Sequence, residues 1–358
     1  MKAWVLHSIN DFKFEEHDNP IPQPGEVLIK VKAAGICGSD IPRAYETGAH
    51  VHPLVTGHEF SGQVVQVADE EHANWIGKRV GIFPLIPCRE CGPCKNEQYE
   101  MCRNYSYLGS RRDGGFAEYV SAPVSNLIEL PDNVTFEQAA MLEPMAVAVH
   151  AMRRGFSLMG SVAEETLNNS TVAVWGLGTI GLLLVMFLKQ AGVRNIYAIG
   201  NKEFQKKQLV ELGIPQENYC DSKSDDAHKW LMNKTEGYGV DLFFECVGKN
   251  QVVAEAVEAT KPAGGIVYVG NPYSDMQFDK PTYWKILRNQ LKITGSWNSS
   301  FTGDDNDDWN YVVQCLAKSC IAPEKLISHR YPMEELEKGF HIMRDKTEDY
   351  VKIMGIGE

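Results

Sequence analysis

The sequence has no uninterrupted apolar run of about 20 residues, the length that a membrane-spanning helix needs. Its opening stretch, MKAWVLHSINDFKFEEHDNP, turns charged before an apolar segment of secretory length appears. Positive charge is also scarce, because 35 Lys and Arg face 47 Asp and Glu and leave a formal net charge of −12. We therefore expect a cytoplasmic protein that acts on small molecules and has neither a membrane nor a nucleic acid as partner.

Internal repeats and low-complexity segments are missing as well. Hydrophobic residues make up 44% of the chain and charged residues 23%, which is ordinary globular composition. A chain of 358 residues usually divides into compact units of about 100 to 200 residues each. We therefore expect two domains in a chain that folds throughout.

The pattern of apolar residues changes along the chain. Short alternating runs such as EVLIKVKAAG, separated by Gly and Pro, predict an all-β unit in the first third. At about Phe136 the run FEQAAMLEPMAVAVHAMRR takes helical spacing, and we expect Pro144 to interrupt it. From Thr171 onward, apolar strands alternate with helical stretches, which predicts a parallel sheet covered by helices. The predicted domains are residues 1–150, 151–293 and a segment 294–358 that returns to the first domain.

Four of the nine cysteines lie close together, as Cys88, Cys91, Cys94 and Cys102 in the spacing C-x2-C-x2-C-x7-C. In a reducing compartment this spacing favours metal ligation over disulfides. A Gly-Pro pair between them supplies the turns that let the thiolates converge on one ion. Because protein ligands fill all four positions, we expect a closed, structural zinc site in residues 88–102.

A glycine motif follows the first strand of the second predicted domain. Gly176, Gly178 and Gly181 form G-x-G-x-x-G between an apolar strand and an apolar helix, which is the context of a dinucleotide-binding fingerprint. The glycines permit a tight turn, close approach of the pyrophosphate and close helix packing, and the helix start offers free N–H groups. We therefore expect this segment, including Thr179 and Ile180, to bind NAD or NADP.

The next strand of this domain, NIYAIG, ends in Gly200. NAD-dependent enzymes carry an acidic residue at this position, which binds the ribose 2′-hydroxyl and would repel a 2′-phosphate. Asn201, Lys202, Lys206 and Lys207 follow as phosphate partners, so the sequence predicts a preference for NADP. The alternative is that these lysines form the solvated face of a helix, in which case either cofactor would serve.

A second set of metal-ligand types is spread over the first domain. Cys37 lies in AAGICGSD, His58 and Glu59 lie in GHEFSG, and Glu143 lies in LEP. A catalytic zinc takes three protein ligands and keeps one exchangeable position, and mixed Cys, His and carboxylate sets meet this requirement. Taken singly, Cys37 is better explained as a small buried residue and His58 as a hydrogen-bonded structural histidine, so the residue types alone do not establish a zinc site.

These motifs, in this order over essentially the whole chain, resemble the zinc-containing medium-chain dehydrogenases. A Glu-Pro pair at Glu143 stands where typical alcohol dehydrogenases carry a Cys ligand, so the chain is most similar to the polyol dehydrogenases of the sorbitol type. The resemblance implies a GroES-like catalytic domain, a Rossmann domain and a homodimer or homotetramer. It also implies that Cys37 and His58 bind the catalytic zinc, that Glu59 or Glu143 completes its ligands, and that water or a substrate oxygen takes the open place.

The same resemblance implies hydride transfer between a secondary hydroxyl and NAD(P), with Ser39 relaying the hydroxyl proton unless it is only a turn serine. The stretches SDIPR, TGAH, GSRRDGGFAEY and TGSW are similar to family members that oxidise a hexitol phosphate, such as galactitol 1-phosphate, to a ketose phosphate such as tagatose 6-phosphate. Arginine forks pair well with phosphate. The candidate substrate residues are Arg43, Arg111 and Arg112, together with His50 and Trp297.

Two alternatives stay open. One is a dehydrogenase of an unphosphorylated polyol, diol or threonine, which would use the same chemistry. The other is a non-catalytic NADPH-binding protein that kept the fold and the structural zinc. Such a protein is expected to have lost Cys37, His58 or Glu143, and all three are present.

Overall fold

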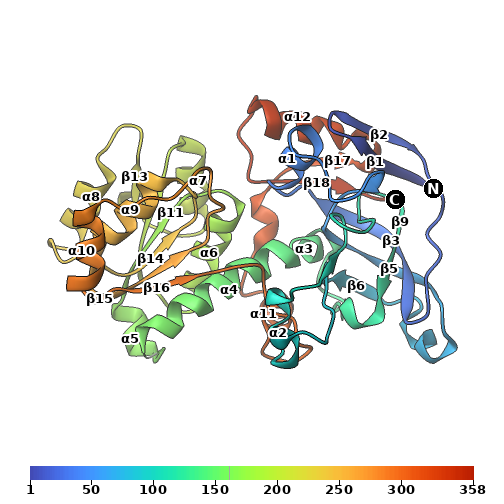
Figure 1. The fold of residues 1–358 in the computed structure, drawn as a ribbon, viewed down its shortest axis with the longest axis horizontal. Coiled ribbons are helices and arrows are strands. Elements are labelled where there is room, and N and C mark those ends of the chain that lie inside the picture. The colour runs from blue at the N-terminus through green and yellow to red at the C-terminus, as the bar shows by residue number, and fades with distance from the viewer. Residues whose placement is uncertain (161) are drawn as a thin grey trace. The chain divides into compact units, whose positions relative to one another are not determined.

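The computed structural model describes residues 1–160 and 162–358 (Figure 1). Contacts divide the chain into two compact units, one made of Met1–Ala146 with Ser299–Glu358 and the other of Val147–Asn298. The second unit is therefore inserted into the first, and the elements near both chain ends lie together in the first unit. No helix among the described residues is long and apolar enough to cross a membrane.

The first unit is built mainly of antiparallel strands. In its largest sheet, the described residues form seven strands in the order β10-β6-β5-β3-β18-β17, with β9 also paired to β3. The apolar alternation of EVLIKVKAAG follows the pleat of β3 (Glu26–Gly35), where Val27, Ile29 and Val31 are buried in the core. The other strands are β1 (Lys2–Ser8), β2 (Asp11–Glu16), β4 (Leu54–Val55), β5 (Glu59–Val67), β6 (Arg79–Ile82), β7 (Leu85–Ile86), β8 (Ser106–Tyr107), β9 (Tyr119–Pro123), β10 (Leu127–Glu129), β17 (Ile327–Pro332) and β18 (Lys352–Ile356).

Short helices complete this unit. They are α1 (Asp40–Tyr45), α2 (Gly92–Lys95), α3 (Phe136–Ala140), α11 (Asp308–Ala317) and α12 (Glu337–Asp345), with 3-10 turns at Glu70–Trp75, Tyr99–Met101, Val124–Asn126, Pro323–Leu326 and Met333–Glu335. The amphipathic helix α12 buries Phe340 and Ile342 in the same core as the large sheet. The expected β-rich first domain is thus confirmed.

The helical run after Phe136 breaks at a different place from the one expected. Thr135 starts α3 with a capping box to Gln138, the helix ends before Met141, and α4 then runs from Leu142 to Met159. Pro144 therefore does not interrupt a helix but lies in the first turn of α4. Its missing N–H costs little there, because first-turn N–H groups have no partner within the helix.

The second unit is a doubly wound α/β fold. Its described strands form a six-stranded parallel sheet in the order β13-β12-β11-β14-β15-β16. The strands are β11 (Thr171–Trp175), β12 (Asn195–Gly200), β13 (Tyr219–Asp221), β14 (Val240–Glu245), β15 (Thr260–Tyr268) and β16 (Lys292–Gly295). The strand order reverses between β11 and β14, and ligands of open α/β sheets bind at such a switch point. The predicted Rossmann-type sheet is confirmed.

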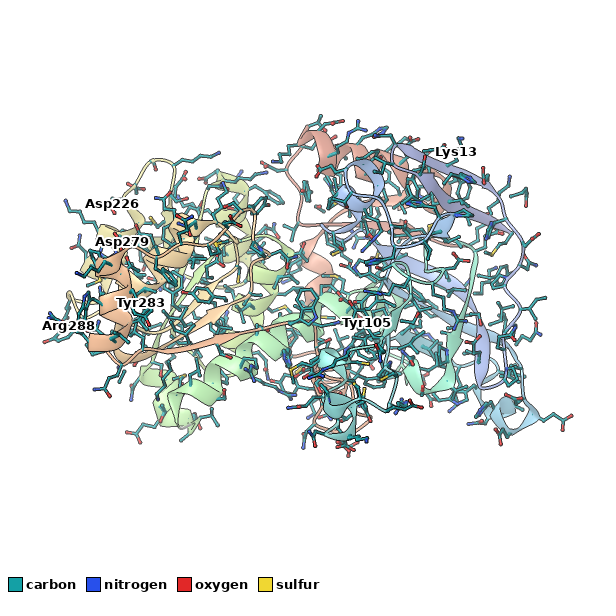
Figure 2. All side chains as sticks on the ribbon, viewed as in Figure 1. Lys13, Tyr105, Asp226, Asp279, Tyr283 and Arg288 are labelled. Atoms are coloured by element: carbon teal, nitrogen blue, oxygen red, sulfur yellow. The ribbon has the colours of Figure 1, made fainter. Side chains whose placement is uncertain are left out.

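Helices cover both faces of this sheet, as Figure 1 shows for α4 and α6 on one side and α8, α9 and α10 on the other. The helices are α5 (Glu164–Asn169), α6 (Thr179–Gln190), α7 (Glu203–Glu211), α8 (Ala227–Lys234), α9 (Asn250–Ala259) and α10 (Lys280–Arg288), with a 3-10 turn at Gln216–Asn218. The apolar run of α6 is almost wholly buried against the sheet. Side chains of α10, including Tyr283 and Arg288, lie at the surface (Figure 2).

Candidate active site

A compact set of metal-ligand types lies where β3 and β5 meet in the first unit. Cys37 follows the end of β3, and Glu59 opens β5, with Gly35 paired directly to Glu59. The Cys37 sulfur, a ring nitrogen of His58 and a carboxylate oxygen of Glu59 all lie within 4.8 Å of one another. The antiparallel register therefore brings together side chains from two separate sequence motifs.

This donor set fits a catalytic zinc. It offers one thiolate, one imidazole and one carboxylate, and three protein ligands leave one position for an exchangeable oxygen. His58 and Glu59 are buried, at 4% and 1% exposure, and Cys37 is only partly buried. Ser39 lies beside the cluster, and its hydroxyl donates a hydrogen bond to the Cys37 sulfur at 3.4 Å.

The buried carboxylate of Asp40, which is not among the predicted site residues, lies next to the His58 ring. Asp40 Oδ1 lies 3.5 Å from His58 Nδ1 and accepts a hydrogen bond from Arg43 at 2.5 Å. Burial lowers the pKa of His58, but the negative charges of Asp40 and Cys37 raise it more, so the net shift is well upward. A carboxylate behind a ligating histidine fixes the orientation of the ring and makes the other nitrogen a better donor to a metal.

Glu143 lies in the first turn of α4 and belongs to the same neighbourhood, although it is outside the compact set of three. The Tyr107 hydroxyl donates to Glu143 Oε1 at 3.2 Å, and the Tyr107 ring meets the His58 ring edge to face at 5.8 Å. Burial raises the pKa of Glu143 to about 7, with Glu59 adding to the shift and His58 opposing it. The Glu143 carboxyl therefore exchanges a proton close to neutral pH.

Lys352 is a further residue of the site that the sequence motifs do not reveal, and it comes from β18 on the other side of β3. Its side chain is 2% exposed, and Nζ donates to Glu59 Oε2 and, at 3.1 Å, to the Ile36 carbonyl oxygen. Burial lowers the pKa of Lys352, but Glu59 and Cys37 raise it more, so the amine stays charged. A single lysine in the apolar run VKIMGI was the only available signal. Lys352 thus supplies the counter-charge to an otherwise anionic cluster.

Three of the predicted substrate residues, Arg43, His50 and Arg111, lie near one another in this unit, and the two arginines carry positive charge. The positive charges of Arg111 and Arg43 act on His50, whose pKa is lowered first by burial and then by these two arginines. Arg111 stacks on Tyr105 with its Cζ atom 4.6 Å from the ring centre (Tyr105 is labelled in Figure 2). The Tyr105 ring in turn meets Tyr107 at 6.2 Å. A chain of ring contacts therefore connects Arg111 to the metal-ligand cluster.

The other two predicted substrate residues lie elsewhere. Arg112 donates to both carboxylate oxygens of Glu26, at 2.5 and 2.8 Å, so its fork is used within the sheet, where Ser121 also bonds Glu26. This geometry favours a structural role for Arg112 over the predicted one, because both terminal nitrogens of its fork already bind one carboxylate, whereas Arg43 uses only one such nitrogen on Asp40. Trp297 belongs to the second unit and is 61% exposed.

The four cysteines of residues 88–102 converge as expected from their spacing. Their sulfurs all lie within 4.8 Å of one another, with close pairs at 3.4, 3.9 and 4.0 Å. Zinc–sulfur bonds of about 2.3 Å at tetrahedral angles place sulfurs about 3.8 Å apart. Cys88, Cys91, Cys94 and Cys102 therefore fit one tetrahedral zinc ion with every position filled.

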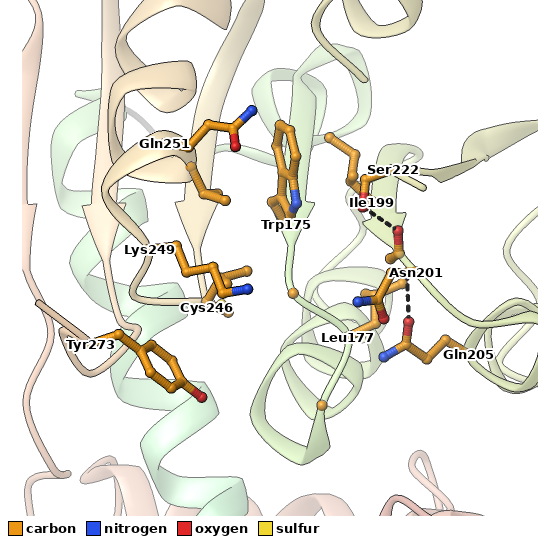
Figure 3. A pocket seen from close by; sticks show the side chains of 15 residues that line it. Trp175, Leu177, Ile199, Asn201, Gln205, Ser222, Cys246, Lys249, Gln251 and Tyr273 are labelled. Atoms are coloured by element: carbon orange, nitrogen blue, oxygen red, sulfur yellow. Dashed lines mark hydrogen bonds between the residues drawn. The ribbon is translucent and has the colours of Figure 1, made fainter. Parts of the chain in front are cut away.

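A pocket of about 360 Å³ opens in the second unit at the switch point of the sheet (Figure 3). Its lining comes from the ends of β11, β12 and β14, and includes Gly176, Gly178, Gly200 and Asn201. Gly176 has φ of +105°, and a Cβ atom there would lie 2.7 Å from the Cys246 carbonyl oxygen. Such a backbone suits only glycine, so this first glycine of the motif makes the tight turn between β11 and α6.

The remaining predicted cofactor residues lie just behind this lining. Thr179, Ile180 and Gly181 form the first turn of α6, whose N-cap is Gly178. A side chain at Gly181 would collide with the Gly176 carbonyl oxygen, so this third glycine permits the close packing of helix and turn. Lys202 caps α7 and does not belong to the lining residues.

Comparison with known proteins gives matches along the whole chain. Residues 23–132 match the family model "Alcohol dehydrogenase GroES-like domain", and residues 179–318 match "Zinc-binding dehydrogenase". The chain is 31% identical over 314 residues to galactitol 1-phosphate 5-dehydrogenase of Escherichia coli K12, with 88% of each chain covered. The chain is a zinc-binding medium-chain dehydrogenase. The predicted family resemblance is thereby confirmed.

Other relatives of this dehydrogenase are comparably similar. Sorbitol dehydrogenase of Halalkalibacterium halodurans is 30% identical over 361 residues, covering 99% of this chain and 98% of the relative. L-threonine 3-dehydrogenase of Bacillus licheniformis is 31% identical over 332 residues, covering 91% and 90%. Sequence identity therefore places the dehydrogenase among enzymes of polyols and related alcohols without separating their substrates.

Solved structures agree with this placement. Galactitol-1-phosphate dehydrogenase of Escherichia coli has a TM-score of 0.87 at 31% identity, covering 99% of this chain and all of the other. A zinc-binding dehydrogenase of Sinorhizobium meliloti 1021 solved with NADP has a TM-score of 0.86 at 26% identity, covering 99% and 98%. An alcohol dehydrogenase of Escherichia coli CFT073 solved with NADH has a TM-score of 0.87 at 27% identity, covering 99% of each chain.

The two metal sites of the dehydrogenase predict two distinct losses. Replacing Cys94→Ser should lower bound zinc from about two ions per chain to about one and lower the melting temperature, because the lobe folds around its metal. Replacing Cys37→Ser should also remove about one zinc, but abolish activity at a nearly unchanged melting temperature. Metal analysis measures the bound zinc, thermal unfolding measures the melting temperature, and alcohol oxidation with NAD or NADP measures the activity. Cys320→Ser, at an exposed thiol outside both sites, is the control, and retention of both zinc ions by Cys94→Ser would refute the structural site.

The buried ion pair of the dehydrogenase gives a second prediction. Lys352→Met should destabilise the metal-free protein by about 3–5 kcal/mol, because it leaves the Glu59 carboxylate buried without a partner. The double variant with Glu59→Gln should recover most of this loss, and chemical unfolding measures all three proteins. Lys338→Met, which breaks an exposed pair with Glu335, should cost at most about 1 kcal/mol. If the double variant is no more stable than Lys352→Met, the unpaired Glu59 carboxylate is not the cause of the lost stability.

Proposed function

We propose that this dehydrogenase oxidises a secondary hydroxyl of a polyol phosphate resembling galactitol 1-phosphate, to give a ketose phosphate such as tagatose 6-phosphate. Its cofactor would be NAD(P), with NADP preferred, and the reaction would take place in the cytoplasm. The observation that carries this proposal is the group of Arg43, His50 and Arg111 beside the zinc ligands. An alternative is a dehydrogenase of an unphosphorylated polyol, diol or threonine.

The positive group is notable because the chain as a whole is acidic, with a formal net charge of −12. An anionic substrate needs a local concentration of cations to overcome this background. Arg43 is connected to the zinc ligand His58 through Asp40, and Arg111 is connected to it through Tyr105 and Tyr107. Cations at this site would hold the phosphate while the hydroxyl to be oxidised points at the metal.

Similarity to relatives supports the dehydrogenase class but not one substrate. The galactitol 1-phosphate, sorbitol and threonine enzymes all stand at about the same identity to this chain. An unphosphorylated polyol carries no charge that would require the arginines. The charged group beside the site therefore favours the phosphate ester over an uncharged polyol or diol.

Cys37, His58 and Glu59 would hold the catalytic zinc, with Glu143 as the alternative carboxylate ligand. When bound, zinc acts as a Lewis acid that makes the alcohol proton easier to remove, and the nicotinamide accepts the hydride. Ser39 is partly exposed and lies against the Cys37 sulfur, so it is placed to pass the hydroxyl proton outward. While it is not bound to zinc, Glu143, with a pKa of about 7, can hold a proton in the same neighbourhood.

The pocket at the switch point of the second unit would bind the cofactor. Its glycine-rich turn precedes the N-terminus of α6, where unpaired N–H groups favour a pyrophosphate. Gly200 removes the carboxylate that commonly selects NAD. The similar structures solved with NADP and with NADH support a nicotinamide dinucleotide in this place.

A substrate comparison tests the proposal. Galactitol 1-phosphate should be oxidised with a kcat/KM at least about a hundredfold above that of galactitol, sorbitol or L-threonine, because each charge-assisted bond to phosphate contributes about 1.5–3 kcal/mol. The measurement is initial-rate formation of NADPH and of NADH by the zinc-loaded enzyme. Equal rates with the free polyols would overturn the phosphate proposal and favour the alternative.

A variant locates the phosphate in the same assay. Arg111→Gln should raise the KM for galactitol 1-phosphate about tenfold or more and leave the cofactor KM unchanged. Arg344→Gln is the matched control, because Arg344 is also exposed and stacks on a tyrosine, Tyr45, at 4.7 Å. If both variants behave alike, Arg111 does not bind the phosphate.

We also propose a homodimer or homotetramer. The strand β16 stands at the edge of the six-stranded sheet of described residues, and exposed apolar side chains lie on it and on the neighbouring α10, at Trp284, Leu287 and Ile293. An uncovered strand edge beside apolar side chains favours self-association. Light scattering on a sizing column should give twice or four times the mass of one chain, and a monomer at micromolar concentration would contradict this proposal.

A further inference from the structure

The end of β12 has a side chain above it that does not come from the strand. A Cβ atom at Gly200 would lie 2.5 Å from Gln205 Oε1 and 3.0 Å from both Leu177 Cδ1 and Tyr219 Cε2. The carboxamide of Gln205, from the first turn of α7, therefore fills the space into which a side chain at position 200 would project. Both Gly200 and Gln205 line the switch-point pocket.

The orientation of the Gln205 amide is fixed by its partner. The backbone N–H of Asn201 donates to Gln205 Oε1 at 2.9 Å. A backbone N–H can only donate, so the oxygen must face it and the nitrogen must face away. The usual ambiguity between the two ends of an amide is thereby removed. Figure 3 shows the Gln205 oxygen joined to Asn201 and the Gln205 nitrogen turned away from that bond, on the pocket side.

The backbone around this amide is held from the neighbouring strand. The Tyr219 hydroxyl accepts a hydrogen bond from the Lys202 N–H at 3.2 Å and donates one to the Lys202 carbonyl oxygen at 3.0 Å. The Ser222 hydroxyl donates to the Gly200 carbonyl oxygen at 2.9 Å. These bonds fix residues 200–202, and with them the position of Gln205.

The charges of the residues that line the pocket favour the same ligand as the outward-facing Gln205 nitrogen does. Within the described part of the chain, the residues that line this pocket include one lysine, Lys249, and no carboxylate. Glu203 and Asp221, which lie on the elements next to Gln205, line a separate hollow instead. A phosphate offers only acceptors and negative charge, whereas a ribose hydroxyl is also a donor that a carboxylate binds well. Fixed donors without an adjacent carboxylate select the phosphate.

We infer that Gln205 determines the choice between the two dinucleotides, by presenting its fixed N–H donors to the 2′-phosphate of NADP at the place where NAD-dependent enzymes put a carboxylate. This inference rests on the proposed use of a nicotinamide dinucleotide. It assigns the discrimination to a residue of α7 rather than to the lysines that follow the strand.

The variant Gln205→Glu tests the inference with little change of shape. Glutamate keeps an oxygen for the Asn201 N–H but turns an anionic oxygen to the pocket in place of the donors. NADPH should bind at least about tenfold more weakly, and NADH should bind within about threefold of its original affinity or more tightly. Fluorescence titration with each reduced dinucleotide measures this, and calorimetry with 2′,5′-ADP and 5′-AMP repeats it without the nicotinamide.

Two further variants make the result decisive. Gln216→Glu makes the same chemical change at an exposed residue of the same unit, outside the pocket, and should leave both affinities unchanged. Gln205→Leu removes the donors without adding charge, and should weaken NADPH and 2′,5′-ADP while sparing NADH and 5′-AMP, even if the glutamate variant does not fold.

The possible results separate the two proposals. If the ratio of NADPH to NADH affinity is the same in the original protein and in both Gln205 variants, or if the original protein binds NADH more tightly, Gln205 does not select the phosphate. If the original protein binds neither dinucleotide, the proposed function itself fails. A ratio that falls only in the Gln205 variants supports the inference.

Discussion

The candidate active site depends on the position of β3 between two antiparallel neighbours. β5 on one side brings Glu59 opposite Gly35, and β18 on the other side brings Met354 opposite the same glycine, close to Lys352. The buried contact between Glu59 and Lys352 therefore closes over the end of β3, directly before Cys37. A thiolate, an imidazole and two carboxylates are tolerated in so small a buried space because this lysine balances part of their charge.

The two units also differ in how many charged groups their sites contain. In the first unit, the anionic metal-ligand cluster lies beside the arginines that we propose to bind an anionic substrate, and Asp40 connects the two by contacting both His58 and Arg43. In the second unit, the pocket is lined by neutral groups apart from Lys249, with no carboxylate among its described lining residues. In the proposed function the first arrangement would hold a reactive centre, whereas the second would select a ligand by hydrogen-bond direction, which needs rigid surroundings more than it needs charge.

Features of the site whose residues lie close together in the sequence could be predicted well. The cysteine spacing and the glycine turn each lie within about 15 residues, so their geometry follows from short-range turns and from the strand and helix beside them. Lys352, Tyr107 and the Glu26 partner of Arg112 depend on which distant strands pair, and composition does not encode that register. Pro144 was misplaced for a related reason, since only the start of α4 decides whether a proline breaks a helix or opens one.

The inserted topology has a consequence for how the protein is made. Lys352 lies 293 positions after Glu59 along the chain, and the whole nucleotide-binding unit is synthesised between them. Domains usually fold as they emerge from the ribosome, the first-made part first. Until β18 is made, the chain lacks the lysine that pairs with the Glu59 carboxylate. The charge balance of the metal-ligand cluster is therefore complete only when the last strand of the sheet has joined β3.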